Sequence, residues 1–109
     1  MSVTLTGKQR RFLRALAHPL KPVVQIGHAG LTASVLSAID LALCDHELVK
    51  VKLGGESDLS PPDLIEAIER ETRSAVAQVI GRVLVVYRPR EKEPRIELPT
   101  AGPHPEDDR

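Results

Sequence analysis

The apolar positions of the chain alternate between the helical period and the two-residue period of a strand, which predicts several short elements of both kinds. The first is a helix that begins at Thr6, because Thr6 and Gln9 have the spacing of a capping box. It ends before Pro19 and Pro22, which cannot continue a helix. Its predicted apolar side consists of Leu5, Phe12, Leu13 and Leu16, and its opposite side of Arg10, Arg11, Arg14 and His18.

A strand, a helix and a second strand are predicted to follow. β-Branched residues favour a strand over residues 23–26, and Thr32 is a suitable N-cap for a helix that runs to about residue 46. Period-two alternation then predicts a strand over residues 47–53. Its apolar residues share one face, and Lys50 and Lys52 project from the other face, where water or an anion can meet them.

The last predicted elements are a helix and a hairpin. Ser60 caps a helix that runs to about residue 72, and two strands over residues 75–80 and 83–88 are joined by the tight connection Gly81-Arg82. The element order is therefore αβαβαββ. Strand–helix–strand units run parallel and hairpins run antiparallel, so we expect an α/β (α+β) fold in which helices pack on a mixed four-stranded sheet.

The end of the chain has a different composition. Prolines recur from Pro89 onward, and the last residues are mostly acidic. Such a segment has little to bury, so we expect it to be mostly disordered from Pro89 onward. The predicted single domain comprises residues 1–99, and an acidic, proline-containing flexible tail comprises residues 100–109.

The segment Gly27-His28-Ala29-Gly30 is a G-x-x-G loop between a predicted strand and a predicted helix. Glycine at both ends is expected to permit positive φ angles and the close approach of a ligand to the backbone. The free N–H groups at the start of the following helix carry a partial positive charge, which suits a phosphate. Two glycines at this spacing are also typical of a plain tight turn, so other residues have to support the site.

Charge is distributed unevenly, although the formal net charge is +0. The segment up to Gly30 contains basic residues and no acidic ones, namely Lys8, Arg10, Arg11, Arg14 and Lys21. A solvated helix face is the alternative meaning, but such a face usually mixes both signs. Around the predicted hairpin, further positive charge comes from Arg82, Arg88 and Arg90. Aromatic residues make up only 2% of the chain, so any nucleic acid must be bound through its backbone rather than by base stacking.

Other classes of function find little support. Cys44 and His46 are two residues apart on a predicted helix and point to opposite sides, so they form no catalytic dyad. The histidines show no metal-ligand spacing, and we expect no metal, cofactor, small-molecule substrate or enzymatic activity. No apolar run approaches the roughly 18 residues of a membrane-spanning helix. A single cysteine and the lack of a secretory signal favour a cytoplasmic protein.

Six segments in order carry a family resemblance: Leu5-Thr-Gly-Lys-Gln, Ala17-His-Pro-Leu-Lys-Pro-Val-Val-Gln-Ile-Gly, Gly30-Leu-Thr, Glu47-Leu-Val-Lys-Val-Lys, Gln78-Val-Ile-Gly-Arg and Leu84-Val-Val-Tyr-Arg-Pro. Together they resemble the bacterial YhbY family, the stand-alone form of the CRM RNA-binding domain. The resemblance implies a domain like the carboxy-terminal domain of translation initiation factor 3, RNA binding, and association with precursors of the large ribosomal subunit. Its G-x-x-G loop is similar to the backbone-clamping loop of KH domains. Family members often have polar or basic residues between the glycines, so here only His28 can add a side-chain contact.

The sequence therefore predicts a monomeric, non-enzymatic RNA-binding protein that contacts ribosomal RNA of the large-subunit precursor. The loop residues Gly27, His28, Ala29 and Gly30 would hold the RNA backbone. Further phosphate contacts are expected from Lys8, Arg11, Arg14, Lys21, Lys50, Lys52 and Arg88. One alternative is a protein-interaction module that docks on a ribosomal protein or assembly factor through the hairpin edge or the acidic tail. A small hydrolase or transferase that uses His28 or Cys44 is the other alternative.

Overall fold

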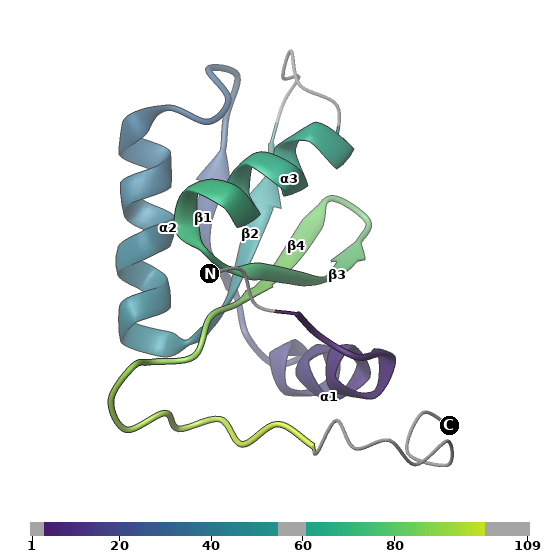
Figure 1. The fold of residues 1–109 in the computed structure, drawn as a ribbon. Helices are drawn as coiled ribbons and strands as arrows, with labels where there is room; N and C mark the ends of the chain where they lie inside the picture. The colour runs from purple at the N-terminus through teal and green to yellow at the C-terminus, as the bar shows by residue number, and fades with distance from the viewer. Residues whose placement is uncertain (1–3, 55–60, 100–109) are drawn as a thin grey trace.

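The computed structural model describes residues 4–54 and 61–99, which form three helices and four strands (Figure 1). In chain order the elements are α1 (Gly7–Ala17), β1 (Pro22–Ile26), α2 (Ala33–His46), β2 (Leu48–Leu53), α3 (Pro61–Thr72), β3 (Ala75–Ile80) and β4 (Val83–Tyr87). This is the predicted αβαβαββ order, with bounds close to those expected. The predicted cap Ser60 lies outside the described residues.

The strands form one mixed sheet with the order β1-β2-β4-β3. β1 and β2 are parallel, with Val24 opposite Val51 and Ile26 opposite Leu53, because α2 crosses over between them. β4 pairs antiparallel with both β2 and β3 and lies between them. The predicted mixed four-stranded sheet is confirmed, and the insertion of β4 places β1 and β3 at its two edges.

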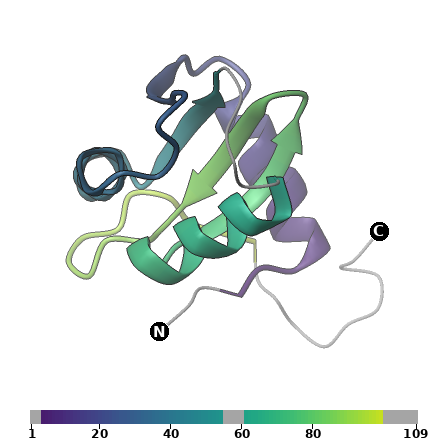
Figure 2. The same ribbon diagram turned by 90° about the horizontal axis from the view of Figure 1, so that it is seen from above.

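Helices cover both faces of this sheet, α2 and α3 on one face and α1 on the other (Figure 2). The α2/α3 core includes Ile39, Leu43, Val49, Val51, Leu53, Leu64, Ile68, Leu84 and Val86. The α1 core includes Leu13, Ala17, Leu48, Val85 and Tyr87. The apolar residues at alternate positions of β2 thus face α2 and α3, and Lys50 and Lys52 project from the α1 face, as the alternation predicts.

Helix α1 begins with the predicted capping box. Thr6 N donates to Gln9 Oε1 at 3.0 Å, and Gln9 N donates to Thr6 Oγ1 at 3.1 Å. Its buried side differs from the prediction, because Gln9 is buried and Leu16 is 41% exposed. The helix packs on β2, β3 and β4, so its side toward β1 stays open and Leu16 lies there.

Arg10, which the sequence placed on the basic side of α1, is bound to the protein's own backbone. Its Nη1 donates to the carbonyl oxygens of Val76 at 2.8 Å and Ala77 at 3.2 Å. The pairing of β3 with β4 shifts register between Val76 and Gln78, and such a bulge leaves carbonyl groups without ladder partners. Arg10 therefore anchors α1 to the edge strand β3.

The segment after β4 is held against the domain by Glu47, the residue that follows α2. Glu47 is only 1% exposed, and its carboxylate accepts hydrogen bonds from the N–H groups of Arg90 at 3.1 Å, Arg95 at 2.6 Å and Ile96 at 3.2 Å. These bonds fold residues 88–96 around the end of α2.

The same segment continues beneath α1. Ile96 and Leu98 pack against the α1 core, and Gln9 Nε2 donates to Pro99 O at 3.0 Å. The expectation of disorder from Pro89 onward is therefore wrong for residues 89–99, because distant groups supply the partners that their composition lacks. Residues 100–109 of the predicted tail lie outside the described residues.

Candidate nucleic-acid interface

The loop Gly27-His28-Ala29-Gly30 follows the carboxyl end of β1 and leads into α2. Gly30 N donates to Gly27 O at 3.0 Å, which closes a tight turn. Thr32 then caps α2, since its Oγ1 accepts from Val35 N at 3.1 Å. The first turn of α2 contains no acidic residue, so the positive end of the helix dipole is not neutralised there.

The two glycines have different structural roles. Gly30 has a φ of 76°, in the left-handed region that favours glycine. Gly27 has no positive φ, so the expectation of positive φ angles at both glycines is wrong at this position. A Cβ at Gly27 would meet no described atom within 4 Å. The backbone conformation thus favours glycine at position 30, whereas the missing side chain at position 27 leaves the backbone open to a ligand.

Three of the predicted lysines follow the β1–β2 pair toward this loop. Lys52 is exposed near the end of β2, and Lys50 lies two residues before it on the same face. Lys50 is partly buried, and its Nζ donates to His18 O at 3.3 Å. Lys21 directly precedes Pro22, which is opposite Lys50 in the sheet register. Lys21, Lys50 and Lys52 form what we call the lysine track.

The predicted residues of α1 lie further from the loop. Lys8, Arg11 and Arg14 are carried by a helix that packs near Leu48 and Tyr87, at the start of β2 and the end of β4. The loop lies at the other end of the sheet, where the parallel strands β1 and β2 both finish, as Figure 1 shows. An RNA that contacts both groups would have to run along the lysine track.

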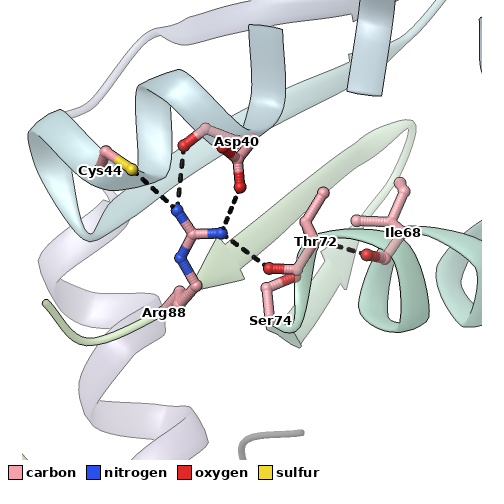
Figure 3. A network of polar contacts seen from close by, with 6 residues as sticks. All are labelled: Asp40, Cys44, Ile68, Thr72, Ser74 and Arg88. Atoms are coloured by element: carbon pink, nitrogen blue, oxygen red, sulfur yellow. Dashed lines mark hydrogen bonds and ion pairs between the residues drawn. The ribbon is translucent and has the colours of Figure 1, made fainter. Parts of the chain in front are cut away.

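Arg88 lies away from the other predicted site residues. Its guanidinium donates to Asp40 Oδ1 at 2.6 Å, Asp40 O at 3.0 Å, Thr72 O at 2.7 Å and Cys44 Sγ at 3.1 Å (Figure 3). Thr72 Oγ1 in turn donates to Ile68 O at 2.7 Å and lies 2.7 Å from Ser74 Oγ. The Arg88 side chain is 18% exposed and connects α2 to the end of α3, so we do not include it in the candidate surface.

The other two arginines near the hairpin also bind main-chain oxygens. Arg90 donates to Cys44 O at 3.0 Å and Asp45 O at 2.8 Å, where it satisfies carbonyl groups at the end of α2. Arg82 Nε donates to Leu53 O at 3.0 Å. Arg82 is exposed and lies beside the carboxyl end of β2, so it is the hairpin arginine that shares an end of the sheet with the G-x-x-G loop.

Two further residues at this end of the sheet were not among those singled out from the sequence. Gln25 is exposed on β1 and is the register partner of Lys52, and Gly54 N donates to Ile26 O at 2.8 Å. The signal for Gln25 was available, because it is the polar residue between two apolar ones on a strand. The position of Gly54 depends on the register of β1 against β2, which sequence spacing does not reveal.

Other kinds of site are not evident. Within residues 4–54 and 61–99, no group of three or more His, Cys, Asp or Glu side chains is arranged to hold a metal ion. The helices of the same ranges are too short or too polar to cross a membrane.

A groove of about 500 Å³ lies between α1 and β1, and its lining includes the exposed side chains of Leu16, Leu20 and Val23.

Comparison with known proteins finds a matching domain family and similar proteins from bacteria. Residues 5–88 match the CRS1 / YhbY (CRM) domain. A Haemophilus influenzae protein named "RNA-binding protein" is 51% identical over 96 residues, which cover 88% of this chain and 96% of that protein. The Bacillus subtilis protein named "Probable RNA-binding protein YqeI" is 39% identical over 95 residues, which cover 87% of this chain and 99% of the relative.

A solved structure agrees with the fold. The solution structure of a hypothetical protein from Staphylococcus aureus superposes with a TM-score of 0.73 at 40% sequence identity, covering 88% of this chain and 100% of that protein. The sequence match extends through the G-x-x-G loop, the lysine track and both sheet edges, from α1 to the residue that follows β4. The chain belongs to the CRS1/YhbY (CRM) domain family.

Proposed function

We propose that this protein binds RNA at the end of the sheet formed by β1 and β2, with its G-x-x-G loop and the lysine track. The backbone of the loop approaches the sugar-phosphate chain, and Lys52 and Lys50 provide charge for the adjacent phosphates. The observation that carries the proposal is the open backbone at Gly27, which the fold itself does not require to be glycine. The names of the relatives support RNA as the ligand.

The RNA in this proposal is ribosomal RNA of the large-subunit precursor, bound in the cytoplasm by a monomer as an assembly factor. No catalytic step and no cofactor take part. His28 is exposed between the glycines and adds a side-chain contact, and Arg14 on α1 extends the basic surface. Crosslinking in cells followed by sequencing of the attached RNA tests the target. Enrichment of large-subunit precursors is expected, and enrichment of unrelated RNAs would contradict it.

The variant Gly27→Asp tests the surface. It places a carboxylate beside the phosphate path without backbone strain, since Gly27 has no positive φ and a Cβ there would meet no described atom within 4 Å. We expect its affinity for transcribed fragments of large-subunit ribosomal RNA to fall at least about tenfold, the effect of roughly 1.4 kcal/mol. Gly30→Asp is less informative, because strain at a φ of 76° would disturb folding as well.

The matched control is Leu41→Asp, which adds the same charge on α2 at a side chain that is 64% exposed. It should bind RNA almost as the unchanged protein does. Equal affinities for Gly27→Asp and the control, with both proteins folded by circular dichroism, would refute the proposed surface.

The groove between α1 and β1 favours docking on a protein as a second candidate function. Leu16, Leu20 and Val23 are 41%, 39% and 52% exposed there, and Lys21 lies among the lining residues. An occupant would be a peptide segment with apolar side chains and an acidic flank. If docking is the main function, Leu20→Glu abolishes association with ribosomal particles and Gly27→Asp does not. RNA binding predicts the reverse.

A further inference from the structure

Gln25 presents an amide beside the proposed RNA path. Its neighbours on β1, Val24 and Ile26, face the α2/α3 core, so the side chain of Gln25 projects from the opposite face of the sheet. There it stands next to Lys52, its register partner, and both residues are exposed. Among the described residues, the structure gives the Gln25 amide no hydrogen-bond partner.

Gly54 makes room for this side chain by lacking one of its own. A Cβ at Gly54 would lie 3.0 Å from Cδ and 3.1 Å from Cγ of Gln25, and closer still to Nε2. Gly54 has no positive φ, so its backbone conformation alone does not require glycine. The absence of a side chain at position 54 therefore leaves room for the Gln25 amide across the end of β2, where Gly54 N donates to the carbonyl of Ile26, the residue before Gly27.

The chemistry of this arrangement fits a ribose hydroxyl. A primary amide both donates and accepts hydrogen bonds, as does the 2′-hydroxyl group that distinguishes RNA from DNA. Stacking of a base on a phenylalanine or tyrosine ring is not available nearby, because Tyr87, the one tyrosine, is 2% exposed and the one phenylalanine, Phe12, packs against the α1 core. The part of a nucleotide closest to the amide would thus be the sugar between two phosphates, one of which contacts Lys52.

We propose that Gln25, positioned by Gly54, contacts the 2′-hydroxyl of a bound nucleotide and makes the domain prefer RNA to DNA. This inference rests on the proposed function, because it concerns the same surface. It adds a residue that determines sugar specificity, whereas the loop and the lysines neutralise and position the backbone.

The experiment compares a single-stranded RNA oligonucleotide with the DNA oligonucleotide of the same sequence, since single strands avoid the different geometries of the two duplexes. Gln25→Met keeps the length of the side chain and removes the amide. We expect it to lower RNA affinity about three- to tenfold, the effect of one lost hydrogen bond, and to leave DNA affinity unchanged. Gln78→Met is the matched control, because Gln78 lies on the same sheet face but on β3.

Gly54→Ala tests the positioning. The added methyl group displaces the flexible end of Gln25, so this variant should lose the same share of RNA affinity as Gln25→Met, again without loss of DNA affinity. In the double variant the two losses should not add, because both act through one amide. Circular dichroism and thermal unfolding establish that each variant is folded.

The outcomes separate this inference from the proposed function. If Gly27→Asp leaves RNA binding unchanged, the surface itself is wrong. Suppose instead that Gly27→Asp weakens RNA binding. If Gln25→Met then lowers RNA and DNA affinity equally, or changes neither of them, the contact to the 2′-hydroxyl is overturned and the proposed surface stands. A change of base preference with an unchanged RNA-to-DNA ratio would also overturn it, since the amide would then read a base.

Discussion

Glu47 combines two features that are individually unfavourable, a backbone φ of 62° and a carboxylate that is removed from water. Three backbone N–H groups from residues 90–96 compensate for the burial, because each donates to one of its oxygens. Glu47 N also donates to Leu43 O, and its own carbonyl accepts from Arg88 N. One residue thus ends α2 and orders the segment after β4.

Replacing Glu47 should therefore destabilise the protein in a graded way. Glu47→Ala removes the acceptor of three part-buried N–H groups, and we expect a loss of about 3–5 kcal/mol in the free energy of unfolding. Glu47→Gln keeps one acceptor oxygen for Arg95 and Ile96 but turns an N–H group toward Arg90, so its loss should be smaller. Urea titration measures both, and equal losses would show that the carboxylate is not the source of the stability.

Tyr87 gives a second prediction at the residue scale, which concerns how the stability of the protein depends on pH. Burial raises the pKa of the Tyr87 phenol above its ordinary value of 10.0, and the charge of Glu47 raises it further. The folded protein therefore keeps this proton at pH values where the unfolded chain loses it. Stability from this residue is complete below about pH 10 and falls as the pH rises from there through the folded pKa.

Tyr87→Phe should remove the part of the loss of stability at alkaline pH that comes from this phenol. The difference in unfolding free energy between the two proteins then changes by up to about 1.4 kcal/mol per pH unit above pH 10. Because the chain has one tyrosine and no tryptophan, the ultraviolet absorbance of tyrosinate reports Tyr87 directly. An ordinary titration in the folded protein would contradict the prediction.

Among the secondary-structure elements, α2 and α3 are joined through a group that the sequence suggested for RNA. The guanidinium of Arg88 bridges Asp40 and Cys44 on α2 and Thr72 at the end of α3, so two helices on the same sheet face share one cation. Arginine suits this position because its planar fork can donate in several directions at once. A lysine has one ammonium group and cannot reach all of these acceptors.

We therefore expect Arg88→Ala to lower the free energy of unfolding by about 2–3 kcal/mol, and Arg88→Lys to recover only part of the loss. At a temperature where all variants are folded, their RNA affinities should match that of the unchanged protein. Chemical unfolding and RNA titration together decide the matter. A large loss of affinity in stable Arg88→Lys would return Arg88 to the RNA surface.

For the molecule as a whole, the net charge is neutral although the lysine track is locally basic. If this track binds RNA phosphates, the RNA affinity must fall as the salt concentration rises. A plot of log affinity against log salt should be steep. Lys52→Gln should reduce its slope by about 0.7–1, one phosphate contact, whereas Arg70→Gln on the opposite sheet face should not. Identical slopes for the two variants would exclude Lys52 from the contact.

Much of the fold could be predicted from local patterns. The capping box of Thr6 and Gln9, the N-cap Thr32 and the outward lysines of β2 each depend on residues a few positions apart, so periodicity and capping chemistry reveal them. The candidate site at Gly27–Gly30 was suggested by local spacing as well, and its role stays a prediction. The different roles of Gly27 and Gly30 could not be predicted, because a φ angle and the space around a missing Cβ depend on neighbours.

The sequence by itself determined the order of the elements, the caps at Thr6 and Thr32 and the face of the lysines on β2, since these follow from short-range spacing. The family was indicated by the resemblance of six segments in order. Only the tertiary structure decided that β4 enters between β2 and β3, that Glu47 holds residues 90–96, that Arg88 joins two helices, and that Gly54 leaves room for Gln25. The physical reason is that hydrogen bonds and close packing between residues far apart in the chain require partners that no local pattern specifies.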